Sequence, residues 1–202
     1  MKNNINSKIR VGLPKGGLKS RSLFLIEKLL HKEIDKRKLS FSNEYFDIYL
    51  LKHRDIPRMV ESGLLDIGIT SIEWIEENGN DVEILHELDW CNTRVSLITS
   101  CFESSFSQTP VKCITEFPNI ARRYFEEKGI PAFIYKISGS SEACVGSIFN
   151  CCVDCVETGA TLAENGLIEY TVLLNSKIVV ISRRNDINIL KNTIVRTAAE
   201  VQ

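Results

Sequence analysis

The sequence predicts an α/β fold in two lobes, each a mixed sheet flanked by helices. Short apolar runs typical of buried strands alternate with amphipathic stretches of helical period along most of the chain. A Ser-rich segment at 101–110 interrupts this alternation, which restarts after it and so indicates a second lobe. With 202 residues and 44% hydrophobic content, the chain can bury one sizeable core or two small ones.

The first lobe opens with three strand and helix pairs. Strands are expected at 8–13, 46–51 and 65–70, and the helices that follow them at 18–31, 56–62 and 72–78. In the first of these helices Leu23, Ile26 and Leu30 fall on one stripe, as expected for a helix that covers a sheet. Asp55 and Pro57 are typical of a helix N-cap and first turn.

The remaining elements supply the second lobe and the return to the first. Strand patterns follow at 82–88, 94–99, 111–114, 133–137, 151–156 and 178–182, and helical patterns at 117–128 and 187–200. We expect the last helix to rejoin the first lobe, which makes that lobe discontinuous. The expected domains are therefore 1–91 with 184–202, and 92–183.

The near-neutral net charge limits the kinds of partner that the protein is expected to bind. A formal net charge of −1 and a pI near 6.3 provide no general attraction to nucleic acid or to an anionic membrane. We therefore expect small anionic ligands, with no nucleic-acid and no membrane partner. The polar N-terminus lacks the apolar region of a signal peptide, and no apolar run is long enough to span a membrane. The cytoplasm is the expected compartment.

The seven cysteines form an odd set, which favours reduced thiols over a disulfide framework. Cys152 and Cys155 have the spacing of a metal chelate, but strand alternation would turn them to opposite faces. No histidine or second cysteine pair completes a site, so we expect no metal centre. We interpret the cysteines as small buried hydrophobes, with a redox-sensitive thiol at Cys155 as the alternative.

The segment 154–166, with the sequence DCVETGATLAENG, is the most informative in the chain. It follows an apolar run and leads into a helical pattern, so backbone N–H groups, the positive helix end and the hydroxyls of Thr158 and Thr161 can converge on one anion. Gly159, followed by Ala160, lets the backbone approach that anion closely. The pattern predicts a phosphate cradle.

Two carboxylates extend this prediction to a sugar phosphate. Asp154 and Glu157 lie just upstream of the cradle, where they can accept hydrogen bonds from ribose hydroxyls. The alternative is an ordinary strand, turn and helix in which the threonines only cap the helix.

Polar residues also follow the strands of the first lobe. Lys15, in a Pro-Lys-Gly-Gly turn, could hold a phosphate or could be a solvated turn lysine. Lys52 ends the next strand. Thr70 and Ser71 end the third, as ligand-facing hydroxyls or as helix caps.

A second turn of this kind follows the strand expected at 133–137. Its sequence, SGSSE, opens a helical pattern and includes Ser140 and Glu142. These residues favour a site for an anion or a hydroxyl, with one carboxylate.

Taken in order, six segments resemble the ATP phosphoribosyltransferase family, the enzymes that open histidine biosynthesis. LPKGGL is similar to the family's LPKGRL, LLKHRDIP to its Arg-x-x-Asp-Ile-Pro loop, and DIGITS to its D-x-GITG. FPNIARRYFEEKG is similar to its helix with the RRYF motif, SGSSE to its NGS-x-E, and DCVETGATLAENGL to its phosphoribosyl-binding loop. The similarity runs from about residue 9 to residue 183.

The resemblance implies a two-lobed core like that of periplasmic binding proteins. Because the chain ends at Gln202, it resembles the short form of the family. That form works in a hetero-oligomer with a regulatory subunit related to histidyl-tRNA synthetase, so such a partner is expected here.

The resemblance also implies substrates and roles. Phosphoribosyl pyrophosphate, carrying Mg²⁺, would place its 5-phosphate on residues 158–161 and its ribose toward Asp154 and Glu142, while ATP fills the rest of the site. N1 of adenine would attack the anomeric carbon as pyrophosphate leaves. N1 already carries a lone pair, so the protein need mainly position the substrates and neutralise the leaving group. Lys15, Lys52 and Arg94, with Mg²⁺, are the groups expected to do so.

Departures from the family pattern concentrate where charge matters. Gly17 replaces the arginine of LPKGRL, Lys52 replaces the arginine before Asp-Ile-Pro, Ser71 replaces a glycine, and Glu116 stands where a lysine is common. Lysine loses the bidentate fork of arginine, and glycine loses its charge. Two alternatives follow: a diverged phosphoribosyltransferase with another acceptor, or a non-catalytic subunit that binds phosphate ligands.

Overall fold

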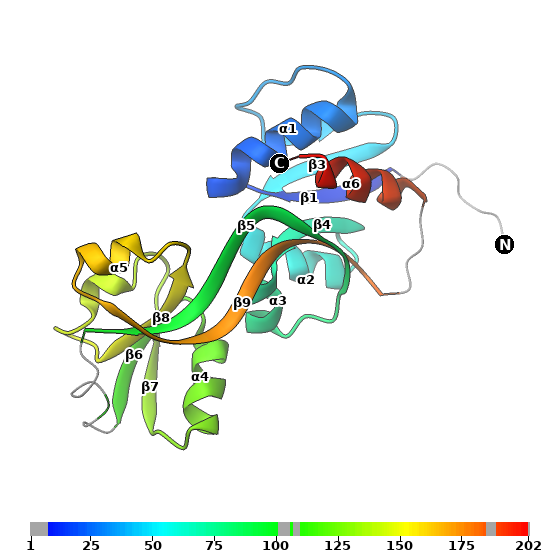
Figure 1. The fold of residues 1–202 in the computed structure, drawn as a ribbon. Coiled ribbons are helices and arrows are strands. Elements are labelled where there is room, and N and C mark those ends of the chain that lie inside the picture. Colours follow the sequence, from blue (N-terminus) through cyan, green and yellow to red (C-terminus); the bar gives the residue numbers. More distant parts are fainter. Residues whose placement is uncertain (1–7, 101–105, 107–109, 185–188, 202) are drawn as a thin grey trace. The chain divides into compact units, whose positions relative to one another are not determined.

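The computed structural model describes residues 8–100, 106, 110–184 and 189–201 (Figure 1). The chain packs as two units, Met1–Cys91 with Lys177–Gln202, and Asn92–Ser176. As domains, the lobes expected at 1–91 with 184–202 and at 92–183 stay a prediction. Most of the Ser-rich segment, Cys101 included, and the expected first residues of the last helix lie outside the described residues.

The first unit is built on a mixed sheet. Its hydrogen-bonded strand order is β2 (Ser40–Ser42), β3 (Phe46–Leu51), β1 (Ile9–Pro14), β4 (Ile67–Ser71) and β9 (Ile168–Ser182). β1 pairs in parallel with both β3 and β4, whereas β2 and β9 pair antiparallel with their neighbours. The three parallel strands therefore end at the same edge of the sheet.

Helices cover both faces of this sheet. Figure 1 shows α1 (Lys19–Leu30) and α6 (Ile189–Ala199) on one side, and α2 (Ile56–Glu61) and α3 (Ile72–Asn78) on the other. β9 illustrates the division, because Val180 packs in the core under α1 and α6 while Val179 and Ile181 pack with α2. This alternation follows from the two-residue period of a strand.

Two glycines allow α2 to lie close to the sheet. Gly12 on β1 and Gly68 on β4 are register partners. A Cβ atom on Gly68 would lie 2.4 Å from Cγ2 of Ile56, and one on Gly12 would lie 2.6 Å from Cδ1 of Leu65. Only glycine leaves room for these apolar side chains at van der Waals distance.

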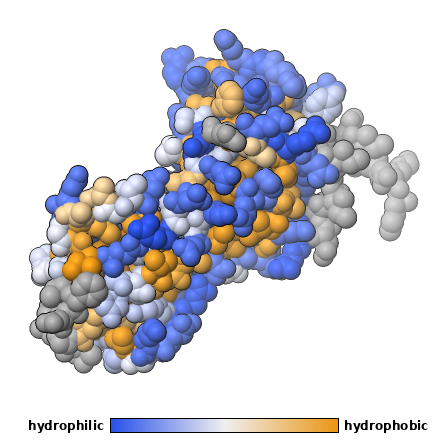
Figure 2. Space-filling view, viewed as in Figure 1, coloured by the Kyte–Doolittle hydropathy of each residue, from blue (hydrophilic) through white to orange (hydrophobic). Residues whose placement is uncertain are grey.

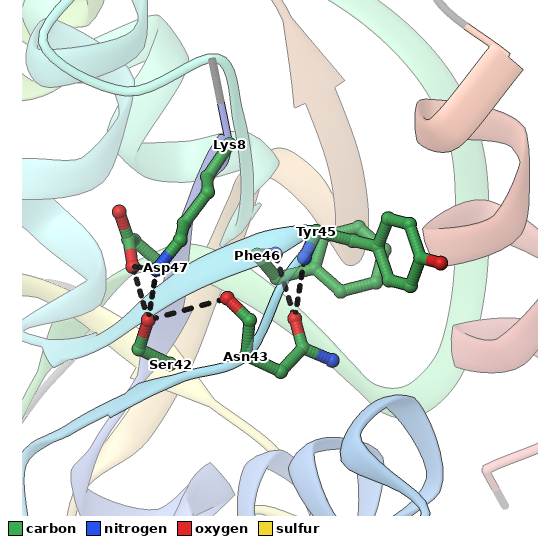
Figure 3. A network of polar contacts seen from close by, with 6 residues as sticks. All are labelled: Lys8, Ser42, Asn43, Tyr45, Phe46 and Asp47. Carbon is green, nitrogen blue, oxygen red and sulfur yellow. Dashed lines mark hydrogen bonds and ion pairs between the residues drawn. The ribbon is translucent and has the colours of Figure 1, made fainter. Parts of the chain in front are cut away.

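A polar network fixes the starts of β1 and β3 (Figure 3). Lys8 Nζ donates to Ser42 Oγ at 2.7 Å and lies 3.4 Å from Asp47 Oδ1, while Ser42 Oγ donates to the same carboxylate at 2.6 Å. Asn43 Oδ1 accepts hydrogen bonds from the backbone N–H groups of Tyr45 and Phe46. These contacts set the turn between β2 and β3.

An ion pair joins β1 to the start of β4. Arg10 donates from Nε and Nη2 to the two carboxylate oxygens of Asp66, at 3.0 and 2.8 Å, and Nη2 also donates to the Gly63 carbonyl. Burial raises the pKa of the Asp66 carboxyl, but the hydrogen bonds and charge of Arg10 outweigh it, so that pKa lies below its usual value.

The second unit is a smaller mixed sheet. Strand order from β9 continues through β5 (Glu83–Thr99), β8 (Cys151–Val156), β6 (Val111–Thr115) and β7 (Ala132–Lys136). β5 and β8 are antiparallel, whereas β6 is parallel to both β8 and β7. The helices are α4 (Pro118–Glu127), packed along β7, and the short α5 (Ala160–Glu164).

Most elements match the sequence predictions, and the structure differs from them in four places. The strands expected at 82–88 and 94–99 are one strand, β5, and the strand expected at 178–182 is only the end of β9. Residues 89–93 and 168–177 mix polar and apolar side chains without clear alternation, so pairing with neighbouring strands decides their conformation. β2 was missed because it is a short polar edge strand. The helix expected to open at SGSSE is a single 3-10 turn, η3 (Glu142–Cys144).

The six described cysteines are free thiols. Cys113, Cys151 and Cys152 are fully buried, and burial raises the pKa of the Cys152 thiol to about 12. These three therefore behave as small hydrophobes, as the sequence predicted. Cys155 is half-buried, and its redox role stays a prediction.

Hydrophilic and hydrophobic residues are interspersed on the visible surface, and hydrophilic ones dominate over α1 (Figure 2). Among the residues that the structure describes, none of the helices has the length and apolarity needed to cross a membrane.

We expect Gly68→Ala to lower the free energy of unfolding by about 1–3 kcal/mol, because the new methyl group must displace Ile56. Gly17→Ala is the matched control, since a Cβ there meets nothing within 4 Å. Urea denaturation of both variants measures the difference. An equal loss in both would contradict the packing role of Gly68.

We expect Asp66→Asn to lower the free energy of unfolding at pH 7 by about 1–2 kcal/mol, a figure discounted for the partial exposure of Arg10. The folded-state pKa of Asp66 is lowered, so its contribution is present above the ordinary pKa near 3.9 and lost as the pH falls through the folded value. The gap between the variant and the native protein should thus close below about pH 4. Asp35→Asn, at an exposed ion pair, is the control and should change stability much less than Asp66→Asn.

Candidate functional site

The predicted phosphate cradle is a strand, turn and helix. β8 ends at Val156, and α5 begins at Ala160 after the N-cap residue Gly159. Gly159 has φ +80° and ψ 0°, a left-handed conformation that L-residues rarely adopt. Leu162 is buried with Val156 in the core of the second unit, and this packing holds the start of the helix against the sheet.

The cradle presents its polar groups outward. The side chains of Glu157, Thr158 and Thr161 are exposed. Thr158 Oγ1 accepts a hydrogen bond from the Ala160 N–H at 3.3 Å, but the N-cap position of the helix is Gly159, which has no side chain to cap it. N–H groups in the first turn of a helix have no partner within the helix. The turn can therefore still offer backbone donors to an anion.

Asp154 is held in one orientation at the end of β8. Its Oδ2 accepts a hydrogen bond from Ser141 Oγ at 2.5 Å, and its Oδ1 accepts one from the Cys155 N–H at 2.7 Å. Ser141 is fully buried, whereas the predicted Ser140 is exposed. The sequence could not distinguish these neighbouring serines, because their directions depend on the turn.

Glu142 and Glu116 both lie at the SGSSE turn of the second unit. Glu142 is half-buried and opens η3, directly after the serine that holds Asp154. Glu116 Oε1 accepts a hydrogen bond from the Gly139 N–H at 2.9 Å, so it ties the SGSSE turn to the end of β6. This contact gives a structural reason for a glutamate where the family pattern has a lysine.

Arg94 lies on β5 beside the cradle. Its Nε and Nη2 donate to the two oxygens of Glu169 at 2.6 and 2.7 Å, and its Nη1 donates to the Glu157 carbonyl at 3.1 Å. The hydrogen bond to Glu169 raises the pKa of Arg94, and the same bond lowers the pKa of Glu169. Both groups are charged near neutral pH, so Glu169 offsets the charge of Arg94. Arg94 as a leaving-group cation stays a prediction.

Lys15 and Lys52 follow two adjacent parallel strands of the first unit. Pro14 and Leu51, the residues before them, are register partners, and the Lys15 N–H donates to the Leu51 carbonyl at 2.8 Å. Both lysine side chains are exposed. The buried Ser22 hydroxyl donates to the Pro14 carbonyl and holds α1 against the turn. The structure therefore brings these two cations to one edge of the sheet.

Thr70 and Ser71 are buried and engaged within the first unit. Thr70 Oγ1 donates to the His53 carbonyl at 2.9 Å, and Ser71 Oγ donates to Glu73 Oε1 at 2.6 Å. Ser71 occupies the N-cap position of α3, but its hydroxyl bonds a carboxylate rather than the backbone. Thr70 thus ties the end of β4 to the turn after Lys52, Ser71 bonds within the first turn of α3, and the contact of both residues with substrate stays a prediction.

Sequence reasoning missed Ser141, Ser96 and Glu169. Ser141 lies in the SGSSE turn, in which only Ser140 and Glu142 were predicted, whereas Ser96 and Glu169 lie within strands and belong to no motif. Their roles depend on which strands are neighbours. In the part of the chain that the structure covers, no three His, Cys, Asp or Glu side chains are grouped to hold a metal ion.

Comparison with known proteins identifies relatives along nearly the whole chain. A family model described as HisG: ATP phosphoribosyltransferase matches residues 52–202. The ATP phosphoribosyltransferase of Campylobacter fetus is 31% identical over 181 residues, which cover 88% of this chain and 89% of that protein.

Solved structures agree on the fold. A chain of the ATP phosphoribosyl transferase (HisG:HisZ) complex from Thermotoga maritima matches with a TM-score of 0.84 at 21% identity, covering 96% of this chain and 98% of that chain. A putative binding component of an ABC transporter from Wolinella succinogenes matches with a TM-score of 0.59 at 12% identity, covering 98% and 91%. The predicted fold class, resembling periplasmic binding proteins, is confirmed.

Proposed function

The chain belongs to the ATP phosphoribosyltransferase family, and we propose how its residues divide the work of that reaction. The enzyme transfers the 5-phosphoribosyl group of phosphoribosyl pyrophosphate to N1 of ATP, giving phosphoribosyl-ATP and pyrophosphate, the first step of L-histidine biosynthesis. Family membership does not favour the two alternatives, another acceptor or a non-catalytic subunit.

We assign the phosphoribosyl group to the second unit. The observation that supports this is the turn after β8, where Gly159 reverses the chain at the start of α5 and Asp154 is fixed by Ser141. The 5-phosphate would accept hydrogen bonds from backbone N–H groups at 158–161 and from the Thr158 and Thr161 hydroxyls. A carboxylate with both oxygens oriented is suited to bind ribose hydroxyls, as Asp154 would do.

Glu142 and Glu157 complete the ribose side of the proposal. Glu142 directly follows Ser141, and Glu157 directly precedes the cradle. Two carboxylates near a sugar can accept hydrogen bonds from its hydroxyls and stabilise positive charge that develops at the anomeric carbon. Ser140, exposed in the same turn as Glu142, would add a hydroxyl.

Lys15 and Lys52 are proposed to neutralise pyrophosphate as it leaves. Their support is the shared edge of the sheet in the first unit and the exposure of both ammonium groups. Mg²⁺ would arrive bound to the substrates and add positive charge there. Thr70 and Ser71 are proposed to act on substrate from the same edge, because they end β4, which pairs in parallel with β1.

The transfer step needs little general acid or base catalysis. The N1 lone pair of adenine forms the new bond to the anomeric carbon while the carbon–oxygen bond to pyrophosphate breaks, and the electron pair of that bond leaves with pyrophosphate. Charge therefore builds up on the leaving group, which is where cations lower the barrier. Positioning of the two substrates supplies the rest.

A regulatory partner and a location complete the proposal. The Thermotoga maritima neighbour was solved as a HisG:HisZ complex, which supports a hetero-oligomer with a regulatory subunit related to histidyl-tRNA synthetase. We propose that this subunit is needed for full activity. The described cysteines are free thiols, which fits a reducing cytoplasm.

Asp154→Ala and Thr161→Ala should each abolish most product formation. The assay mixes the protein with Mg²⁺, phosphoribosyl pyrophosphate and ATP, with and without a short-form regulatory subunit, and measures pyrophosphate and ribosylated ATP. Glu164→Ala, at an exposed position at the end of α5, is a control that should keep turnover. Binding of phosphoribosyl pyrophosphate by the native protein without product, even with the partner, would overturn ATP as acceptor.

Gly17→Arg tests the acceptor side. A Cβ atom at Gly17 meets nothing within 4 Å, so a side chain can begin there, and an arginine would restore the family's charge close to Lys15. We expect ATP-dependent turnover to rise several-fold, about the effect of one added charge contact. Gly17→Gln, of similar length without the charge, should leave turnover unchanged. No gain from Gly17→Arg would show that the missing arginine does not limit this enzyme.

A further inference from the structure

We propose that Glu169 and Ser96 are positioning residues for the phosphate cradle, and that they act through Arg94. This inference rests on the proposed function of the cradle and assigns roles to two residues outside the family motifs. It also changes the role of Arg94, from a cation for the leaving group to a support of the phosphate turn.

The three residues meet because β5 lies between β9 and β8 in the sheet. Arg94 on β5 has Val156 of β8 as its register partner on one side, and its side chain bonds Glu169 of β9 on the other. From this central strand, one guanidinium reaches both the neighbouring strand and the turn that follows β8. A residue on any other strand of this unit would not border both.

The contacts fix the guanidinium in its plane. Two parallel N–H bonds of 2.6 and 2.7 Å join Arg94 to Glu169 in the bidentate geometry that arginine favours. Ser96, two residues further along β5, donates from Oγ to Glu169 Oε1 at 2.6 Å. Strand alternation places Ser96 on the same face as Arg94, so the carboxylate is itself held from two sides.

The third guanidinium nitrogen of Arg94 bonds the cradle. Its Nη1 donates to the carbonyl of Glu157, the residue before Thr158, at 3.1 Å. A Cβ atom built on Gly159 would lie 4.0 Å from Nη2 of Arg94, so the guanidinium lies against the turn. Fixing this carbonyl fixes its peptide plane, which also carries the Thr158 N–H at the start of the cradle.

The charge of Glu169 beside Arg94 favours a supporting role for Arg94 over a role as the cation that neutralises the leaving group. Glu169 matches the positive charge of Arg94, which weakens the attraction of Arg94 for a second anion. The rigid fork of the guanidinium is what the three hydrogen bonds require, and the ammonium group of lysine lacks it.

The test compares two cross-strand ion pairs. Glu169→Gln breaks the ion pair between Arg94 and Glu169 beside the cradle. Glu87→Gln is the matched control, because it breaks the ion pair between Lys177 and Glu87, 2.7 Å apart, which joins the same two strands elsewhere. We expect Glu169→Gln to raise the Kd and the KM for phosphoribosyl pyrophosphate about tenfold, with the KM for ATP and the Tm near those of Glu87→Gln. Ser96→Ala should give a smaller change in the same direction.

Arg94→Lys distinguishes a role of Arg94 in supporting the cradle from a role that needs only its positive charge. If Arg94 acts through the cradle, Arg94→Lys should show the same rise in Kd for phosphoribosyl pyrophosphate as Glu169→Gln. Native affinity with a lowered kcat in Arg94→Lys would overturn the inference in favour of a leaving-group role. Equal Kd values in Glu169→Gln and Glu87→Gln would also overturn it.

Calorimetric Kd values keep this test independent of turnover. If the native protein binds phosphoribosyl pyrophosphate but makes no product, ATP as acceptor fails while the affinity comparison still decides the role of Glu169. If the native protein does not bind phosphoribosyl pyrophosphate, the cradle and its proposed support both fail.

Discussion

Parallel pairing of strands is the constraint on which both parts of the candidate site depend. In the first unit, β1, β3 and β4 end at one edge, and the residues that follow or end them are Lys15, Lys52 and Ser71. In the second unit, the parallel strands β6, β7 and β8 also end at one edge, and they are followed by Glu116, the SGSSE turn and the cradle. Because parallel strands carry their carboxyl ends together, segments far apart in sequence become neighbours within each unit.

Close packing maintains this arrangement in the first unit. The opposed glycines Gly12 and Gly68 allow Ile56 and Leu65 to approach the sheet, and the start of α2 follows Lys52 by a single turn. Gly68 lies in the family motif DIGITS, which suggested a ligand-facing loop, yet its glycine serves helix packing. The polar part of that motif, Thr70 and Ser71, is likewise buried and hydrogen-bonded to neighbouring turns.

In the second unit, supporting hydrogen bonds surround the residues proposed to touch substrate. Ser141 orients Asp154, Glu116 holds the SGSSE turn, and Arg94 with Glu169 holds the carbonyl before Thr158. Such supports keep donors in place before the ligand arrives, which reduces the entropy lost on binding. They also explain why a departure from the family pattern, such as Glu116, need not weaken the site.

The sequence alone determined the α/β class, most strands and helices, and the strand, turn and helix around Gly159, because local periodicity and turn chemistry carry that information. The order of motifs determined the family. Only the tertiary structure decided that β5 and β9 are long strands, that Ser141 rather than Ser140 holds Asp154, and that Glu169 pairs with Arg94. These features depend on which strands lie side by side and on the direction of each side chain in a turn, and neither is encoded in a local pattern.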